Sequence, residues 1–257
     1  MSYQVPQHID KNKIFIVKRS EIEGRLEPEF YSPSIFALEK KIRSLSSHKL
    51  SFYAKSLVGG ATPLKSCSDE YYSNEKEGIP FLRVQNLQSD GNINLSNCLY
   101  IITDIDDLGC LKENNKVTCK NIEQNYILHK NDLLFACSGS VGKCYIHKRI
   151  SEPAIFAGYL IRFIINAAII NPNYLFYYCN CSLYKYWVDT IQRPAVQANI
   201  NSEEFRQMII PLPPLAKQQE IADHITALRH QAAQLQQEGK EALEKAKQEV
   251  EQMILGK

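Results

Sequence analysis

The region from Leu215 to the C-terminus constrains the fold most, because it is suited to one kind of structure. It contains no proline, and glycine occurs only at positions 239 and 256. Proline and glycine are the residues that interrupt helices, so the region is predicted to be helical throughout. A helix of about 40 residues is about 60 Å long at ~1.5 Å per residue. The sequence therefore predicts a long rod at the end of the chain.

Apolar residues along this rod recur at alternating steps of four and three, which is the spacing of a coiled-coil seam. They are Ile221, Ile225, Leu228, Ala232, Leu235, Leu243, Ala246, Val250 and Met253. The spacing changes phase at Gly239, where we expect a stutter.

A helix with a single apolar stripe is not stable alone in water and needs a partner. We therefore expect the rod to form a partner or dimer interface. Its predicted residues are Ile221, Ile225, Leu228, Leu235, Leu243 and Val250. The alternative is a helix that folds back on its own domain.

Residues 1–214 are predicted to form a separate domain, and residues 215–257 form the rod. Strands are predicted at 14–17, 52–58, 81–84, 98–102, 132–137, 143–147 and 156–165, where β-favouring runs are separated by Gly, Asn, Asp and Ser. Helices are predicted at 34–44 and 174–188. Pro211, Pro213 and Pro214 make a rigid exit from the domain. The fold class is α+β, a mostly β domain with flanking helices followed by a long C-terminal coiled-coil helix.

The composition is that of an ordinary globular protein, with 44% hydrophobic and 23% charged residues. The net charge of +2 is small for a nucleic-acid-binding protein. If DNA is bound, either the basic residues gather on one face or partner subunits supply much of the phosphate contact.

Membrane insertion and secretion are not predicted. The longest apolar run, 154–170, is broken by Arg162 and Asn166 and is typical of buried strands. The N-terminal residues lack the apolar core of a signal peptide, which favours the cytoplasm. The eight cysteines contain no CxxC pair, so we expect small core residues in a reducing compartment and no structural metal.

Two short segments in the first half of the domain carry candidate binding features. GGATP, at residues 59–63, has glycines that permit positive φ and close backbone approach, although an ordinary tight turn uses them equally. IPFLRVQNL, at residues 79–87, ends a strand in Arg83, Gln85 and Asn86. Arginine pairs with guanine, and Gln or Asn with adenine, in the major groove. The alternative is that these are solvated strand residues.

A third segment, KNDLLFACSGSVGK at residues 130–143, resembles a nucleotide-binding loop only superficially. Such a loop needs Gly where Cys137 stands and Ser or Thr where Cys144 stands. The segment instead predicts a hairpin with a Gly/Ser turn. Ser138, Ser140 and Lys143 are candidates for phosphate contacts, and a purely structural turn is the alternative.

The fourth segment, QANINSEEFRQMIIPLPPLAKQQEI at residues 197–221, follows Arg193 and runs into the rod. Its alternating amides include Gln197 and Asn199, which either read bases or tie loops together by hydrogen bonds. For Arg193 we favour DNA contact.

Other catalytic patterns fail. Asn171–Tyr174 reads NPNY, a near miss for the motif with which adenine methyltransferases hold a flipped base. Asn173 replaces its second proline and no Gly-rich donor-binding loop follows a strand, so we interpret the segment as a helix cap. The six histidines show no HxxxH spacing, so metal-assisted hydrolysis has no support.

The four segments in this order, followed by the rod, resemble the specificity subunit of type I restriction-modification enzymes. The resemblance extends from about Arg25 to the C-terminus, and residues 25–33 resemble the family's entry segment. It implies a protein that performs no chemistry, binds no cofactor or metal, and reads one part of a split double-stranded DNA site. The implied DNA-binding residues are Lys65, Arg83, Gln85, Asn86, Ser138, Ser140, Lys143, Arg193, Gln197 and Asn199.

The resemblance also implies partners. Methyltransferase subunits that use S-adenosylmethionine would methylate adenine, and a motor-nuclease subunit would complete the enzyme. A full-length specificity subunit carries two recognition domains and two helices, whereas this chain carries one of each. It is therefore either a half-size subunit that forms a homodimer through the rod or a piece of a longer chain. Met1 and a rod that ends near the C-terminus favour the first.

Two alternatives remain open. In the first alternative, the chain is the recognition fragment of a fused methyltransferase-nuclease. In the second, it is a coiled-coil decoy that occupies methyltransferase subunits without reading DNA. DNA binding and donor binding distinguish these three functions.

Overall fold

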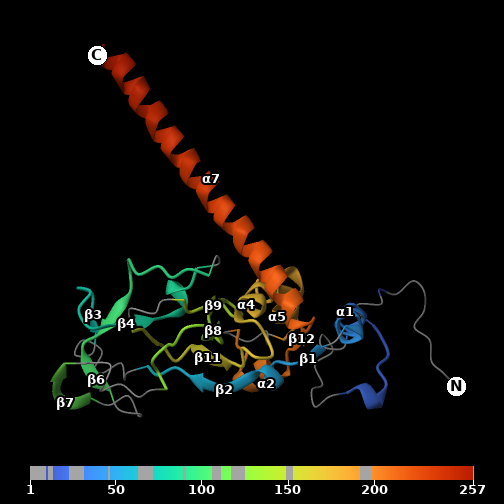
Figure 1. The fold of residues 1–257 in the computed structure, drawn as a ribbon. Coiled ribbons are helices and arrows are strands. Elements are labelled where there is room, and N and C mark those ends of the chain that lie inside the picture. The colour runs from blue at the N-terminus through green and yellow to red at the C-terminus, as the bar shows by residue number, and fades with distance from the viewer. Residues whose placement is uncertain are drawn as a thin grey trace.

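Figure 1 shows a computed structural model of the chain as a ribbon. The structure describes residues 10, 14–22, 32–45, 47–62, 72–88, 91–105, 111–116, 125–148, 153–191 and 198–256. The α-helices are α1 Pro33–Ser44, α2 Leu50–Tyr53, α4 Pro172–Tyr178, α5 Ser182–Ile191, α6 Ser202–Gln207 and α7 Leu215–Leu255, and the short 3-10 helices are η1 Arg19–Glu21 and η4 Val84–Asn86. The strands are β1 Ser47–Lys49, β2 Ala54–Gly59, β3 Tyr72–Ser73, β4 Ile79–Leu82, β5 Leu99–Ile101, β6 Thr103–Ile105, β7 Leu111–Lys116, β8 Leu133–Ala136, β9 Cys144–Ile146, β10 Ile155–Phe156, β11 Leu160–Ile165 and β12 Ile209–Pro211.

Two four-stranded sheets carry most of the strand pairing in the described residues. The central sheet has the order β2-β11-β8-β9, and its neighbouring strands are antiparallel. The second sheet has the order β10-β4-β5-β3, with β10 parallel to β4. Strand β1 pairs with β12, and β6 pairs with β7. The β1–β12 pair brings the start of the chain's β region beside the exit to α7.

The central sheet is covered on both faces, because alternate side chains of a strand point to opposite sides. Leu133 and Phe135 belong to a core cluster shared with residues of α4, α5 and α6. Leu134 and Ala136 belong to a second cluster that includes Leu82 of the other sheet. The central sheet therefore lies between a helical layer and the second sheet, which explains why β8 is apolar at every position.

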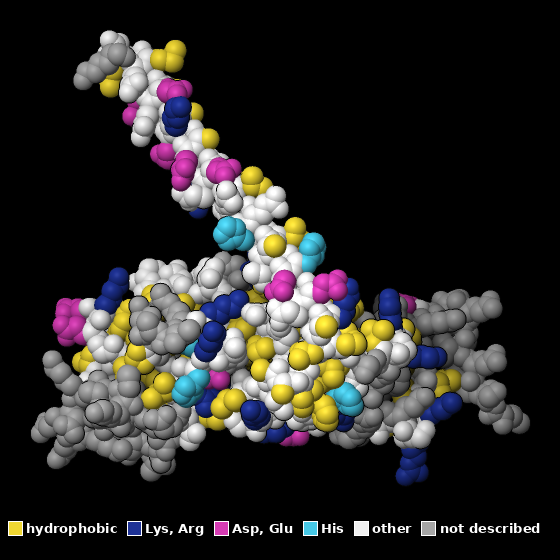
Figure 2. All heavy atoms as spheres, in the orientation of Figure 1, with side chains coloured by type: hydrophobic (Ala, Val, Ile, Leu, Met, Phe, Trp, Pro, Cys, Tyr) yellow, Lys and Arg dark blue, Asp and Glu magenta, His cyan; other side chains and the backbone are white. Residues whose placement is uncertain are grey.

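Helix α7 projects from the body of the molecule as a straight rod (Figure 1). It begins directly after Pro214 and ends at Gly256, whose φ of 67° is the left-handed conformation of a helix C-terminus. Every residue from 230 to 256 is exposed. Figure 2 shows hydrophobic side chains along the projecting part. The predicted long helix is confirmed, and it passes through Gly239 without a break.

Several predicted elements are confirmed with small shifts. Helix α1 and strands β5, β8 and β9 occupy the predicted segments, and Asn171 caps α4 by accepting the N–H groups of Asn173 and Tyr174 at 2.8 and 3.2 Å. The predicted helix at 174–188 is two helices, α4 and α5, separated by a turn at Cys179–Cys181. Its aromatic residues pack in the core from both helices, and the spacing alone did not locate the turn.

Three strand predictions need correction. Residues 14–17 form no strand, and residues 52–53 belong to α2. The run at 156–165 is divided between β10 and β11, which lie in different sheets. A turn at Ala157–Leu160, closed by the Leu160 N–H and the Ala157 carbonyl at 2.9 Å, carries the chain from one sheet to the other. Continuous apolar character concealed this turn because both strands are buried.

Two further predictions concern membrane insertion and the role of the cysteines. In the part of the chain that the structure describes, no helix has the length and apolar character needed to cross a membrane. Five cysteines there are free and wholly or partly buried: Cys98, Cys137, Cys144, Cys179 and Cys181. The predicted core role is confirmed for these five, while Cys67, Cys110 and Cys119 lie outside the described residues.

Candidate nucleic-acid interface

The sequence segments singled out above meet at one end of the central sheet, around the turn at Ala157–Leu160. The Ala157 N–H donates to the Leu82 carbonyl of the second segment at 2.9 Å. The Gly60 N–H of the first segment donates to the Leu160 carbonyl at 2.9 Å, and the Cys137 N–H of the third donates to the Tyr159 carbonyl at 3.0 Å. We call this end of the sheet the rim, consisting of Gly60–Thr62, Leu82, Cys137–Ser140, Ala157–Leu160 and Asn199–Ile200.

Gly60 allows the first segment to reach the rim. A Cβ at this position would lie 2.1 Å from the Ala157 carbonyl oxygen, which is far inside van der Waals contact. The hydroxyl of Thr62 then accepts the Gly158 N–H at 2.9 Å. The close backbone approach predicted for the two glycines is therefore confirmed at Gly60, while Pro63 lies outside the described residues.

The third segment forms the predicted hairpin between β8 and β9. The Ala136 N–H donates to the Lys143 carbonyl at 2.8 Å, and the Gly142 N–H donates to the Ala136 carbonyl at 2.9 Å. Gly139 and Gly142 have φ values of 77° and 79°, which a side chain would strain. A Cβ on Gly142 would also lie 2.6 Å from the side chain of Val188, so α5 fixes the position of the turn.

The fourth segment joins the rim through the residues that directly follow β8. Ser138 and Asn199 form an antiparallel bridge, and the Ile200 N–H donates to the Cys137 carbonyl at 3.0 Å. Directly after it, Asn201 and Glu204 cap α6 reciprocally. The two residues that follow β8 therefore contact both the turn at Ala157–Leu160 and the fourth segment.

The predicted DNA-binding residues differ in exposure. Gln85, Ser140 and Asn199 are exposed. Arg83 and Lys143 are partly buried. Lys65, Arg193 and Gln197 lie outside the described residues. The exposed polar side chains thus come from the second, third and fourth segments.

The positions of Asn86 and Ser138 correct two of the expectations. Asn86 is 2% exposed; its side-chain oxygen accepts the Arg83 N–H at 2.9 Å, and its side-chain nitrogen donates to the Asn94 carbonyl at 3.0 Å. Ser138 is 3% exposed and lies in the bridge to Asn199. A side chain enclosed in this way cannot reach a base edge, so both residues hold the framework in this structure.

Arg83 and Lys143 also bind the framework, each with one of its several donors. The Arg83 guanidinium donates from Nη2 to the Asn97 carbonyl at 2.9 Å. The Lys143 ammonium donates to the Leu87 carbonyl at 2.9 Å and so ties the hairpin to the second segment. Both cations keep further N–H groups, which is compatible with phosphate or base contact in addition.

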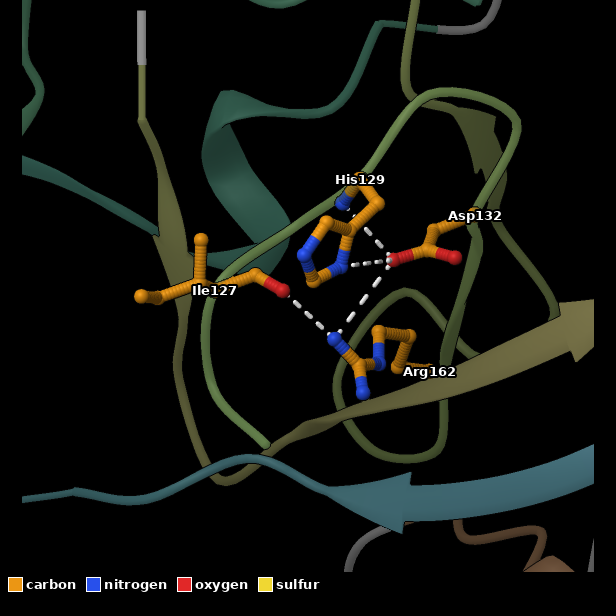
Figure 3. A network of polar contacts seen from close by, with 4 residues as sticks. All are labelled: Ile127, His129, Asp132 and Arg162. Atoms are coloured by element: carbon orange, nitrogen blue, oxygen red, sulfur yellow. Dashed lines mark hydrogen bonds and ion pairs between the residues drawn. The ribbon is translucent and has the colours of Figure 1, made fainter. Parts of the chain in front are cut away.

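A buried ion pair lies between β8 and β11 and was not predicted (Figure 3). The side chains of Arg162 and Asp132 are 3% and 5% exposed, and Nη1 of the arginine lies 3.5 Å from Oδ2 of the aspartate. The same Nη1 donates to the Ile127 carbonyl at 2.5 Å, and the His129 N–H donates to Asp132 Oδ2 at 2.8 Å. The sequence signal was a charged residue inside each of two apolar runs.

Burial dominates the electrostatics of this pair. Loss of solvent raises the pKa of Asp132, and the His129 N–H and the Arg162 charge only partly offset it. Loss of solvent likewise lowers the pKa of Arg162, against the attraction of Asp132. The network anchors residues 127–132 to the central sheet, at the end opposite the rim.

A known protein family matches the part of the chain that forms the rim. Residues 54–245 match the family described as type I restriction modification DNA specificity domain. This chain belongs to that family. The matched range contains all four segments that meet at the rim, and it includes most of α7.

Solved structures resemble this chain at low sequence identity, and two of them, with TM-scores above 0.5, show a similar fold. A chain from a study of complex assembly and conformational transition of the type I R-M system has a TM-score of 0.51 and 14% identity, over 79% of this chain and 45% of that one. The HsdS subunit from Thermoanaerobacter tengcongensis has a TM-score of 0.49 and 14% identity, over 78% and 44%. The type IIG restriction endonuclease BpuSI has a TM-score of 0.52 and 9% identity, over 77% and 28%. This specificity domain thus spans less than half the length of these type I relatives.

The first turns of α7 attach the rod to the body of the specificity domain. Ala222 is buried in the same core cluster as α4, and Ile221 packs partly against it. The Tyr177 hydroxyl lies 2.7 Å from the Thr226 hydroxyl, and the guanidinium of Arg229 lies over the ring of Tyr177 at 5.6 Å. Ile221 therefore contacts its own domain in this structure.

Further along the rod the predicted seam residues are exposed. Leu228 is 51% exposed, Leu235 60%, Leu243 58% and Val250 53%, whereas Ile225 is partly buried. The fold-back alternative therefore applies to the base of α7, and the part from Leu228 onward carries an uncovered apolar stripe.

Proposed function

We propose that this chain is the sequence-specific DNA-recognition subunit of a type I restriction-modification system, directing methyltransferase and nuclease subunits to a split site. The observation that carries the proposal is the family match over residues 54–245, because that range contains every segment that meets at the rim. In this proposal residues 1–214 read DNA and residues 215–257 connect the reader to its partners.

The chain itself performs no chemistry in this proposal. Methyltransferase subunits methylate adenine with S-adenosylmethionine, and a motor-nuclease subunit cuts unmodified DNA. The contribution of this chain is binding energy and placement. Contacts to phosphates would position the domain, and contacts to base edges would specify the sequence.

The DNA contacts we propose begin with the exposed polar residues Gln85, Ser140 and Asn199. Arg83 and Lys143 would add charge from donors that the framework leaves over. Lys65, Arg193 and Gln197 stay in the proposal on the strength of the sequence alone. With a net charge of +2, the isolated chain should bind DNA weakly and lose affinity as salt rises.

We further propose a homodimer formed through α7. The exposed stripe at Leu228, Leu235, Leu243 and Val250 supports it, since an apolar stripe of this length in water favours association. Two antiparallel rods would be related by a two-fold axis, so each recognition domain would read the same half-site on opposite strands. The target would then be a split palindrome.

A gel shift with a pool of random-sequence duplexes tests the proposal, using the chain alone and mixed with methyltransferase subunits. The proposal predicts weak binding by the chain alone and much tighter binding by the mixture. Binding of methyltransferase subunits without any DNA binding would identify the chain as a decoy and would overturn the proposal.

A second candidate is the recognition part of a fused methyltransferase-nuclease. The specific observation in its favour is the likeness to the type IIG restriction endonuclease BpuSI, of whose chain this one covers 28%. Calorimetry with S-adenosylmethionine on the whole polypeptide that the natural gene encodes separates the two. A fused enzyme requires donor binding by the same polypeptide, whereas a separate recognition subunit requires none.

A further inference from the structure

Tyr159 is an exposed aromatic residue at the centre of the rim. It is 60% exposed, although the residues on either side of its turn, Ala157 and Leu160, are 6% and 0% exposed. Its backbone carbonyl accepts the Cys137 N–H at 3.0 Å. It lies outside the four sequence segments that were predicted to carry the DNA-binding residues.

The turn that carries Tyr159 is fixed by hydrogen bonds on both sides. The Leu160 N–H and the Ala157 carbonyl close it at 2.9 Å, and the Gly158 N–H donates to the Thr62 hydroxyl at 2.9 Å. Strand β11 continues from it directly, paired with β2 and β8. The Tyr159 backbone is therefore held rigidly, and little backbone entropy would be lost when its side chain binds a partner.

Apart from Tyr159, the exposed side chains among the described residues of the rim are neutral and polar. Thr62 lies across the turn, Ser140 lies in the hairpin that follows Cys137, and Asn199 pairs with Ser138. Hydroxyl and amide groups of Ser, Thr, Asn and Tyr are a main source of hydrogen bonds to DNA phosphates. Such donors come here from four separate chain segments, and one of them is a tyrosine on a fixed backbone. This group of side chains suits the sugar-phosphate backbone better than a base edge or an apolar protein surface.

We propose that Tyr159 contacts the DNA backbone, with its phenol hydroxyl donating a hydrogen bond to a phosphate oxygen. This inference rests on the proposed function and adds to it a specific residue that positions the domain on the duplex. A neutral donor releases no counterion when it meets a phosphate. Tyr159 therefore contributes affinity that does not depend on salt, unlike the contribution of a lysine.

The test compares Tyr159→Phe and Tyr159→Leu with the unchanged full-length chain. Fluorescence anisotropy measures binding to a labelled pool of random-sequence duplexes over a range of potassium chloride concentrations. Tyr159→Phe should weaken binding about tenfold to a hundredfold, in line with the loss of one hydrogen bond to a charged group. The slope of log affinity against log salt should stay the same, and Tyr159→Leu should bind no better than Tyr159→Phe.

Phe52→Leu is the matched control. Phe52 is 54% exposed and stacks on His48; it lies in α2, which precedes β2 at the end away from the rim. At ~3.3 Å per residue, the six residues of β2 separate it from the rim by about 20 Å. Its replacement should leave DNA affinity unchanged.

Three results overturn the inference. If both Tyr159 variants bind like the unchanged chain, Tyr159 is not a contact, while the proposed DNA-recognition function stands. If only Tyr159→Leu is weakened, the ring rather than the hydroxyl makes the contact. If the unchanged chain binds no duplex, even with methyltransferase subunits present, the proposed function fails and this inference fails with it.

Discussion

The side-chain oxygen of Gln218 accepts the backbone N–H of Asn171 at 2.8 Å, and this contact joins the rod to the body of the molecule. Gln218 is 0% exposed, and its nitrogen donates to the Pro213 carbonyl at 2.8 Å and to the Ile169 carbonyl at 3.4 Å. A buried amide with all these partners fits in one orientation only. Gln218 therefore fixes the direction in which α7 leaves the domain.

Replacing Gln218 with Leu should loosen this joint. The Asn171 N–H and two carbonyls would lose their partner, and each buried unpaired group costs about 1–3 kcal/mol. We expect the free energy of unfolding, measured by urea denaturation, to fall by at least about 3 kcal/mol, and the distribution of maximum dimension in small-angle X-ray scattering to broaden. Gln219→Ala is the control, because Gln219 is exposed and its side chain bonds the Asn171 side chain and Asp223 of its own helix but no backbone group of the body. If the Gln218→Leu variant is as stable and as rigid as the unchanged chain, apolar packing alone fixes the direction of the rod.

Replacing Asp132 of the buried ion pair should lower the free energy of unfolding more than replacing Arg162. Asp132→Asn leaves the Arg162 charge buried without a counter-charge, which typically costs about 3–5 kcal/mol. Arg162→Met should cost less, since Asp132 can take up a proton and its pKa is already raised by burial. Urea denaturation at neutral pH measures both. Equal losses, or a larger loss for Arg162→Met, would contradict this account.

The Arg162→Met variant should also depend on pH in a defined direction. In this variant Asp132 is still buried, which raises its pKa, but the Arg162 charge that lowers its pKa is gone. A carboxyl whose pKa is raised in the folded state contributes stability at low pH, which is lost as the pH rises through the folded pKa. The stability deficit relative to the unchanged chain should therefore grow from about pH 4 to pH 7.

His129 also faces the Asp132 carboxylate, at 3.8 Å. The pH series should therefore be repeated with His129→Gln in both chains. A deficit that shrinks as the pH rises, with or without His129, would assign the pH dependence to another group.

The exposed seam of α7 predicts self-association. Replacing Leu228 and Leu235 with Lys places charges in the stripe, so a dimer of the unchanged chain should become a monomer. Sedimentation or light scattering gives the mass directly. Gln234→Lys with Gln237→Lys adds the same charge outside the predicted seam and should leave the dimer intact. A monomeric unchanged chain would overturn the homodimer.

Sequence patterns predicted the elements whose signal is local. The rod, the β8–β9 hairpin and the Asn171 cap follow from proline-free periodicity, a Gly/Ser turn and an Asn-Pro start, all of which are read from neighbouring residues. The turn at Ala157–Leu160 was missed because an apolar run looks the same whether one buried strand or two compose it. The division of 156–165 depends on which sheet covers each half, and that is a property of the whole fold.

The candidate site was predicted at the level of segments rather than of side chains. All four segments do meet, but the burial of Asn86 depends on residue Asn94, and the burial of Ser138 depends on Asn199. Tyr159 gave no signal, since exposure of an aromatic residue inside an apolar run is set by the turn that carries it. Contacts between distant segments decide which polar group faces solvent.

Methylome sequencing tests the central claim most directly. A host that lacks other type I systems would carry the genes for the methyltransferase subunits, with and without the gene for this chain. The account predicts adenine methylation at one new motif only when this chain is present, and that motif should be a split palindrome if two copies pair through α7. An asymmetric split motif would require a second, different recognition domain. No new methylated motif, despite folded chain and active methyltransferase, would contradict the account.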